Sequence, residues 1–197
     1  MPHPHDGFIV VRGYRLRKQT TVFSIPAARS LPMISACFEP LTRPDARILI
    51  LGSLPGQMSL RLERYYANPQ NAFWRIMAAT FGFPPDLPYP ERIAALQKHR
   101  IAVWDVCASA FRPGSLDSNI SQMVVNDFHS FFTTHPAIGL ICFNGTTAEK
   151  LYRKNVLRTL SKPFSELPAK PLPSTSPAHA GMTFAEKLAL WKPALTE

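Results

Sequence analysis

Two short segments, far apart in the sequence, carry the side chains that could do chemistry. The first is GSLPG, Gly52 to Gly56, followed by YYANPQNAFW at Tyr65 to Trp74; the second is LPSTSPAHA at Leu172 to Ala180. An aromatic face can stack a nucleobase, and a side-chain amide can read a base edge or hold a water. The first segment therefore has the residue types of a nucleobase site.

GSLPG follows an apolar run, Ile48 to Leu51, that has the length of a buried strand. We therefore expect a loop at the carboxyl end of that strand, where open α/β sheets bind ligands. No Lys-Ser/Thr pair follows and the glycine spacing is too short, so neither a P-loop nor a dinucleotide fingerprint is present. A simple connecting turn is the alternative for this segment taken alone.

Three side chains near these strand ends each allow a structural and a functional interpretation. Asn71 either caps the helix expected to begin there or takes part in catalysis. Tyr66 either packs in the core or faces a ligand. Asp105 stands near the end of the apolar run Ile101 to Val106, where a carboxylate is either satisfied by hydrogen bonds or functional.

LPSTSPAHA has two prolines and three consecutive hydroxyl side chains, which predicts a rigid loop with hydroxyl and backbone donors. Such a loop suits a phosphate backbone, whose contacts position a protein without reading sequence. His179 either contacts phosphate or is solvated. The serine and histidine also suggest a hydrolase, but the chain has no G-x-S-x-G elbow, which disfavours that class.

The elements that would position both segments alternate between strands and helices. Apolar runs predict strands at 48–51, 101–106 and 137–143, with a weak fourth between 165 and 172. Helical spacing predicts helices at 71–81, 91–98, 120–129, 148–152 and 183–191, the fourth capped by 144–147. We expect an α/β fold of three layers, α/β/α, with a central, mainly parallel four-stranded sheet.

The composition favours one globular domain that carries a basic N-terminal extension. A chain of 197 residues, 46% of them hydrophobic, is long enough for a single core. Residues 1–32 hold five basic side chains against one aspartate, so we expect a flexible extension there and a domain over 33–197. The net charge of +9 suits a polyanionic partner.

The three cysteines, Cys37, Cys107 and Cys142, lack the close spacing of a zinc or iron-sulfur site. We expect free thiols in a reducing cytoplasm and no metal. No apolar run approaches the roughly 18 residues of a membrane span, and residues 1–32 lack the apolar stretch of a secretory signal. A cytoplasmic, bacterial-type monomer without a membrane partner is the expectation.

Six motifs, taken in order, make the chain resemble the uracil-DNA glycosylase superfamily. They are GSLPGQMSL, YYANPQNAFW, VWDV, RPGSLDSNI, CFNGTTAEKLY and LPSTSPA, and they look most like the hypoxanthine-DNA glycosylase branch. The resemblance covers Phe38 to Trp191. It implies a uracil-DNA glycosylase-like fold and a monofunctional DNA repair enzyme that flips a deaminated base out of double-stranded DNA and hydrolyses its N-glycosidic bond without a cofactor.

The resemblance also implies a role for each site residue. Asn71 and Asp105 are the expected catalytic residues, with Asn71 positioning the attacking water and Asp105 meeting the base. The residues expected to bind the base are Gly52, Ser53, Leu54, Pro55, Gly56, Tyr66 and Asn144. Those expected to hold the DNA backbone are Ser174, Thr175, Ser176, Pro177 and His179.

One residue departs from the family pattern. Leu54 stands where mismatch-specific relatives have an asparagine and classical uracil enzymes an aspartate, and leucine can neither accept a proton nor orient water. This disfavours plain uracil chemistry and moves the role of that polar residue to another group, for which Asn71 is the first choice. Hypoxanthine, the base of deoxyinosine, is the substrate that the resemblance to the hypoxanthine-DNA glycosylase branch implies. Excision of uracil or xanthine by the same fold, and a non-catalytic DNA-binding protein on this scaffold, remain the alternatives.

Overall fold

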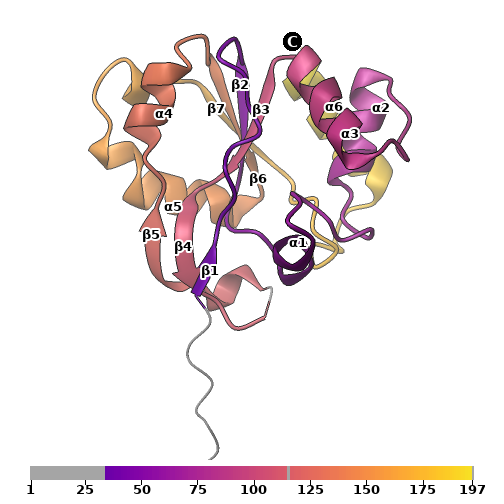
Figure 1. Cartoon of the computed structure of the whole chain (residues 1–197), viewed down its shortest axis with the longest axis horizontal. Helices are drawn as coiled ribbons and strands as arrows, with labels where there is room; N and C mark the ends of the chain where they lie inside the picture. The colour runs from indigo at the N-terminus through magenta and orange to yellow at the C-terminus, as the bar shows by residue number, and fades with distance from the viewer. Residues whose placement is uncertain (1–33, 115, 197) are drawn as a thin grey trace, which may run out of the picture. The chain divides into compact units, whose positions relative to one another are not determined.

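The computed structural model describes residues 34–114 and 116–196 (Figure 1). The basic N-terminal segment expected over 1–32 lies outside these residues.

A four-stranded parallel sheet with the order β3-β2-β6-β7 forms the centre. β2 (Ile48–Gly52) pairs in parallel with both β3 (Ile101–Asp105) and β6 (Leu140–Asn144), and β6 pairs with β7 (Ala169–Leu172). The weak fourth strand predicted between 165 and 172 is thus confirmed. Because the strands are parallel, their carboxyl ends all meet at one edge of the sheet.

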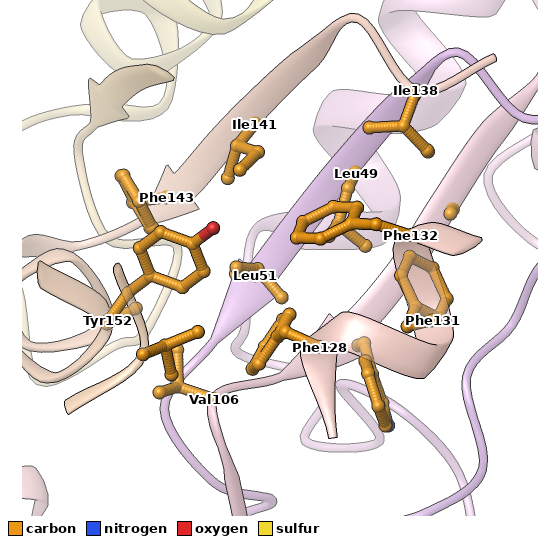
Figure 2. Packing of buried hydrophobic residues seen from close by; sticks show 14 of the residues in the cluster. Leu49, Leu51, Val106, Phe128, Phe131, Phe132, Ile138, Ile141, Phe143 and Tyr152 are labelled. Carbon is orange, nitrogen blue, oxygen red and sulfur yellow. The ribbon is translucent and has the colours of Figure 1, made fainter. Parts of the chain in front are cut away.

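One face of the sheet is covered by α4 (Phe128–Thr134) and α5 (Thr146–Asn155). Leu49 and Leu51 of β2 point to this side, where they pack with aromatic side chains of the two helices, among them Phe132 (Figure 2). These side chains leave almost no accessible surface, so the first helical layer is held by a dry aromatic core.

The opposite face is covered by α2 (Phe73–Phe81), α3 (Tyr89–Lys98) and α6 (Phe184–Thr196). Ile50, between the two leucines, points to this side, as successive strand residues must. Burial on both faces explains why β2, β3 and β6 read as continuous apolar runs instead of alternating ones. The three-layer α/β/α prediction is confirmed.

A second, antiparallel sheet was not predicted. β1 (Ile34–Ala36), β4 (Cys107–Phe111) and β5 (Ser121–Val125) pair in the order β1-β4-β5, and β4 follows β3 after a single residue. Figure 1 shows these strands beyond the end of the main sheet, below α5, with α1 (Gln57–Leu62) to their right. The small sheet therefore extends the edge at which the parallel strands end.

The helix predicted at 120–129 is wrong. Residues 121–125 form β5 against β4, and α4 begins only at Phe128, where the Asp127 carboxylate accepts a hydrogen bond from the backbone N–H of Ser130. Ile120 and Met123 pack beside Leu54 in a small apolar cluster. Their spacing imitates one face of a helix, and only the pairing with β4 distinguishes the two structures.

The other helix boundaries differ from the predictions by a few residues. α2 begins at Phe73 and ends before Gly82, whose φ is +72°. α5 begins at Thr146 with Gly145 as its N-cap and no side-chain cap, and α6 continues to Thr196. Short 3₁₀ turns occur at Asp117–Asn119, Leu157–Thr159 and Phe164–Glu166.

Candidate active site

A pocket of about 570 Å³ opens at the carboxyl edge of the parallel sheet, between the two segments singled out in the sequence. Residues 52–59 form one side of it and residues 174–179 another. All of the predicted site residues line this one pocket: Gly52, Ser53, Leu54, Pro55, Gly56, Tyr66, Asn71, Asp105, Asn144, Ser174, Thr175, Ser176, Pro177 and His179. Segments far apart in the sequence thus meet in one place.

The GSLPG loop has all five of its carbonyl groups engaged by the protein. The donors to these carbonyls, from Gly52 to Gly56, are Val106 N (2.9 Å), Cys107 N (3.1 Å), Arg112 Nη1 (3.1 Å), Arg112 Nη2 and Leu60 N (3.0 Å). A protein donor for each carbonyl holds the loop in one conformation.

Leu54 contributes its backbone and not its side chain to the chemistry of the loop. The side chain is buried against Cys107 and Ala110, beneath the loop. A polar residue at this position would have to leave that apolar cluster or bury an unsatisfied group. The departure from the family pattern at Leu54 is therefore built into the packing of the small sheet.

Asp105 presents a buried carboxyl group at the floor of the pocket. The residue is 3% exposed, and it is the register partner of Gly52 in the neighbouring strand. Its Oδ2 atom has no hydrogen-bond partner in the described part of the chain. Burial raises the pKa of Asp105 to about 7, against the opposing effect of the Arg112 cation. The group can therefore exchange a proton near neutral pH.

Tyr66 lies beside Asp105 and is held in an unusual backbone conformation. Its φ is +52°, which is uncommon for a large residue, and its ring stacks on Phe73 with centroids 3.9 Å apart. The hydroxyl points toward Gly52, is buried, and makes no hydrogen bond of normal geometry among the described residues. Burial and the nearby Asp105 carboxyl raise the pKa of this phenol.

Asn71 lies one residue before the N-cap of α2, which is Ala72, so the capping interpretation of Asn71 is wrong. Its Oδ1 accepts a hydrogen bond from the backbone N–H of Phe73, the first residue of the helix, at 3.0 Å. Its amide nitrogen makes no hydrogen bond within the described residues and lies at the pocket. The side chain is thus oriented by the helix and has a donor left for a water or substrate.

The loop at 174–179 is fixed through Asn144 and Thr175. The Asn144 side chain accepts from Thr175 N at 2.8 Å and donates to Thr175 Oγ1 at 2.9 Å. Thr175 is 1% exposed, and its carbonyl accepts from Ala72 N at 2.9 Å, next to Asn71. The pair therefore ties the second loop to β6 and to the start of α2.

Ser174 and Ser176 continue this loop toward the rim of the pocket. Gly145 passes so close that a Cβ there would lie 2.9 Å from Ser174 Cβ, and its φ of +95° also requires glycine. Pro177 and His179 are exposed, and buried Lys187 donates to the His179 carbonyl at 2.9 Å. Pro177 and His179 thus face solvent, while the hydrogen bond from Lys187 fixes the backbone of the loop at His179.

Sequence reasoning missed the pair Arg112 and Asp117. Arg112 is 2% exposed, donates to the Leu54 and Pro55 carbonyls, and forms an ion pair with Asp117 at 3.4 Å. Burial raises the pKa of Asp117, although the Ser53 hydroxyl and Arg112 oppose the shift. Both residues lie in RPGSLDSN, where an arginine and an aspartate look like solvated loop charges. Only the fold reveals that they fasten the GSLPG loop.

The described ranges contain no cluster of three or more His, Cys, Asp or Glu side chains that could hold a metal ion. The three cysteines are free thiols, and two of them, Cys107 and Cys142, are buried. Within the same ranges no helix is long and apolar enough to cross a membrane.

Residues 39–194 match the Uracil DNA glycosylase superfamily, and the chain belongs to that superfamily. The match spans both loops of the pocket and every strand of the parallel sheet. The family resemblance expected from the six motifs is thereby confirmed.

Individual relatives narrow the comparison. The chain is 40% identical over 117 residues to the hypoxanthine DNA glycosylase of Methanosarcina acetivorans. These aligned residues make up 59% of this chain and 74% of that protein. The chain is 37% identical over 109 residues to the hypoxanthine DNA glycosylase of Methanosarcina barkeri. The aligned residues here make up 55% of this chain and 69% of that protein. A solution NMR structure from Methanosarcina acetivorans, provisionally assigned to the uracil DNA glycosylases, has a TM-score of 0.69 and 35% identity, covering 84% of this chain and 100% of that one.

Proposed function

We propose that this protein excises hypoxanthine from deoxyinosine in double-stranded DNA and leaves an abasic site. It is a DNA repair glycosylase, an enzyme that hydrolyses N-glycosyl bonds and acts on deaminated bases. The choice of hypoxanthine rests on the two relatives that carry that name and on Leu54, whose buried side chain supplies no polar group for uracil chemistry.

The observation that carries the proposal is the buried Asp105 Oδ2 at the floor of the pocket, which has no hydrogen-bond partner among the described residues and has the Tyr66 hydroxyl close to it. Buried polar atoms cost free energy unless a partner satisfies them, and a bound base edge supplies such partners. Hypoxanthine carries a carbonyl oxygen next to a ring N–H. A protonated Asp105 can donate to that oxygen and accept from that N–H at the same time.

Catalysis then depends on stabilising separated charge. Breaking the N-glycosidic bond builds positive charge on the sugar and negative charge on the departing base. A neutral Asp105 and the N–H groups of the GSLPG loop would donate to the base as its charge grows. The free amide nitrogen of Asn71 would hold the water that attacks the sugar. An asparagine does not take up the proton that this water loses when it attacks. Departure of the base therefore runs ahead of water attack, and the base anion that has left gains one proton as the water loses one.

The second loop would hold the DNA backbone. Ser174 and Ser176 bring hydroxyl groups to the pocket, and Pro177 and His179 stand exposed at its rim. Thr175 and Asn144, whose polar side-chain atoms bond to one another, would fix this loop instead of touching DNA or base. This refines the roles that the sequence suggested for them.

We further propose that one glycosylase domain spans 33–197, preceded by the basic segment 1–32, and that the protein acts as a monomer. We also propose that it acts in the cytoplasm of a bacterial-type cell, at the nucleoid. The charge of the chain, +9, suits association with the phosphate backbone.

The test is a panel of duplexes that differ only in the lesion. Purified protein in excess should convert deoxyinosine strands into alkali-cleavable abasic products without added cofactor. Duplexes with deoxyuridine and deoxyxanthosine, run alongside, test the sister activities. If every duplex is bound in a salt-sensitive way but none is cleaved, the protein is a DNA-binding scaffold and the proposal is wrong.

A further inference from the structure

A second pocket, of about 500 Å³, adjoins the candidate active site. It is lined by residues from two stretches of the chain, 62–75 and 85–92. Four residues line both pockets: Tyr65, Tyr66, Asn68 and Asn71. Because these residues form a shared wall, a group bound in the second pocket lies beside the nucleotide in the first.

Three arginines, Arg64, Arg75 and Arg92, line this second pocket, which we call the arginine pocket. The ion pairs of residues 34–114 and 116–196 include none of the three. Asp86 is the only carboxylate among the described residues that line the pocket, and it is exposed. Three cations against one carboxylate make the pocket attractive to an anion.

Aromatic rings in the wall of the arginine pocket are covered by two of these cations. The Arg64 guanidinium lies over the Tyr89 ring, 5.5 Å from its centroid, and that of Arg92 lies 5.9 Å from the centroid of Trp74. Both rings line the pocket. Since the cations occupy the ring faces that a base would need for stacking, the pocket favours an anion over a nucleobase.

Two of the arginines are held by further contacts. The Arg75 guanidinium lies 4.3 Å from the centroid of the Phe184 ring, at the start of α6. The Nε atom of Arg92 donates to the Leu87 carbonyl at 2.6 Å. A guanidinium that is already oriented loses little conformational entropy on binding, and its planar set of N–H groups matches the oxygens of a phosphate.

We propose that the arginine pocket binds a backbone phosphate of the DNA strand that carries the flipped nucleotide. That strand must continue away from the base pocket, and the wall formed in part by Tyr66 and Asn71 separates the base pocket from the arginines. The inference rests on the proposed function, because the flipped nucleotide defines the strand. It adds a backbone contact separate from the loop at 174–179, which does not line the arginine pocket.

Two double variants with the same net charge test the site. Arg64→Gln with Arg75→Gln removes two exposed cations of the pocket, and Arg47→Gln with Arg158→Gln removes two exposed cations that line neither pocket. Binding is measured against salt concentration on a duplex whose deoxyinosine carries a 2′-fluorine, which blocks cleavage. The pocket variant should bind about tenfold or more weakly and lose about one from the salt slope. The control should keep the slope of the unmodified protein.

A second measurement locates the phosphate. Each phosphate of the lesion strand is replaced in turn with an uncharged methylphosphonate. At one position within a few nucleotides of the lesion, the replacement should weaken binding by the unmodified protein and by the control, but not by the pocket variant. Equal losses for all three proteins at every position would overturn the proposal.

The outcomes separate this inference from the proposed function. Neither measurement needs base release, so a reduced salt slope in the pocket variant supports the arginine pocket even if hypoxanthine is not excised. Equal slopes for the two double variants, with excision intact, would overturn the pocket alone. Calorimetry with inorganic phosphate tests the other source of the same chemistry. If the pocket variant loses affinity for inorganic phosphate but binds DNA as the control does, the pocket takes free phosphate and the proposal is wrong.

Discussion

Gly52 and Asp105 are register partners at the carboxyl ends of β2 and β3, and a Cβ on Gly52 would overlap the Asp105 carboxyl. The Tyr66 hydroxyl is the next nearest group, 3.2 Å from the same point. The missing side chain of Gly52 is therefore what lets a carboxyl and a phenol converge at the floor of the pocket.

Gly52→Ala should disable the site while leaving a folded protein. The added methyl would displace Asp105 or Tyr66, and a shift of about 1 Å in a reacting group can cost about 100-fold in rate. Single-turnover excision from deoxyinosine DNA is the measurement. Gly139→Ala is the control, because nothing lies within 4 Å of a Cβ there; similar rates for both variants would contradict the account.

Asp105 should govern how the rate depends on pH. If the neutral carboxyl donates to the departing base, the rate is constant below the pKa of about 7 and falls at higher pH. Asp105→Asn keeps a donor and an acceptor but cannot ionise. Its profile should lose the alkaline decline; a decline that persists in this variant would assign it to another group.

The same residue should lower stability as pH rises. The pKa of Asp105 is raised from 3.8 to about 7 on folding, so the folded state holds the proton more tightly and is destabilised between roughly pH 4 and pH 7. Asp105→Asn removes this effect. We expect Tm to rise by at least about 4 °C at pH 8 and by clearly less at pH 5, measured by calorimetry.

The parallel sheet and the pocket could be predicted from the sequence because the informative residues are local. Apolar runs ending in Gly52 and Asp105 mark strand ends, and strand ends of a parallel sheet meet at one edge. The antiparallel sheet could not be predicted, since its strands are short and half-buried and gain their order from pairing. The roles of Arg112 and Asp117 could not be predicted either, because they depend on the contact of Arg112 with the GSLPG loop and on its ion pair with Asp117. Both the antiparallel sheet and the Arg112–Asp117 pair are determined by tertiary contacts between segments and not by local sequence.

Tyr66→Phe should stabilise the free enzyme and weaken catalysis. A buried hydroxyl without a partner costs about 1–3 kcal/mol, so its removal should raise Tm by a few degrees. Loss of a group that meets the base should slow excision about tenfold. Tyr152→Phe is the matched control, because the Tyr152 hydroxyl is also buried, has no hydrogen-bond partner in the described part of the chain, and lies away from the pocket. It should gain Tm and keep full activity.

Arg112 and Asp117 should shift the alkaline decline in opposite directions. The Arg112 cation lowers the pKa of Asp105 and the Asp117 carboxylate raises it. Arg112→Met should therefore move the decline to higher pH and Asp117→Asn to lower pH. Arg112→Met should also lose about 3–5 kcal/mol of stability, because it strands two loop carbonyls and Asp117. Arg153→Met, in an exposed pair with Glu149, should do neither.

The most direct test of the central claim is detection of the released base. Protein in excess is incubated with a duplex that carries one deoxyinosine, and free hypoxanthine is quantified by chromatography alongside the abasic strand. We expect the two in equal amounts from the unmodified protein, and neither from Asn71→Ala, which should still bind the duplex. No free hypoxanthine from the unmodified protein, or equal release from Asn71→Ala, would contradict the account.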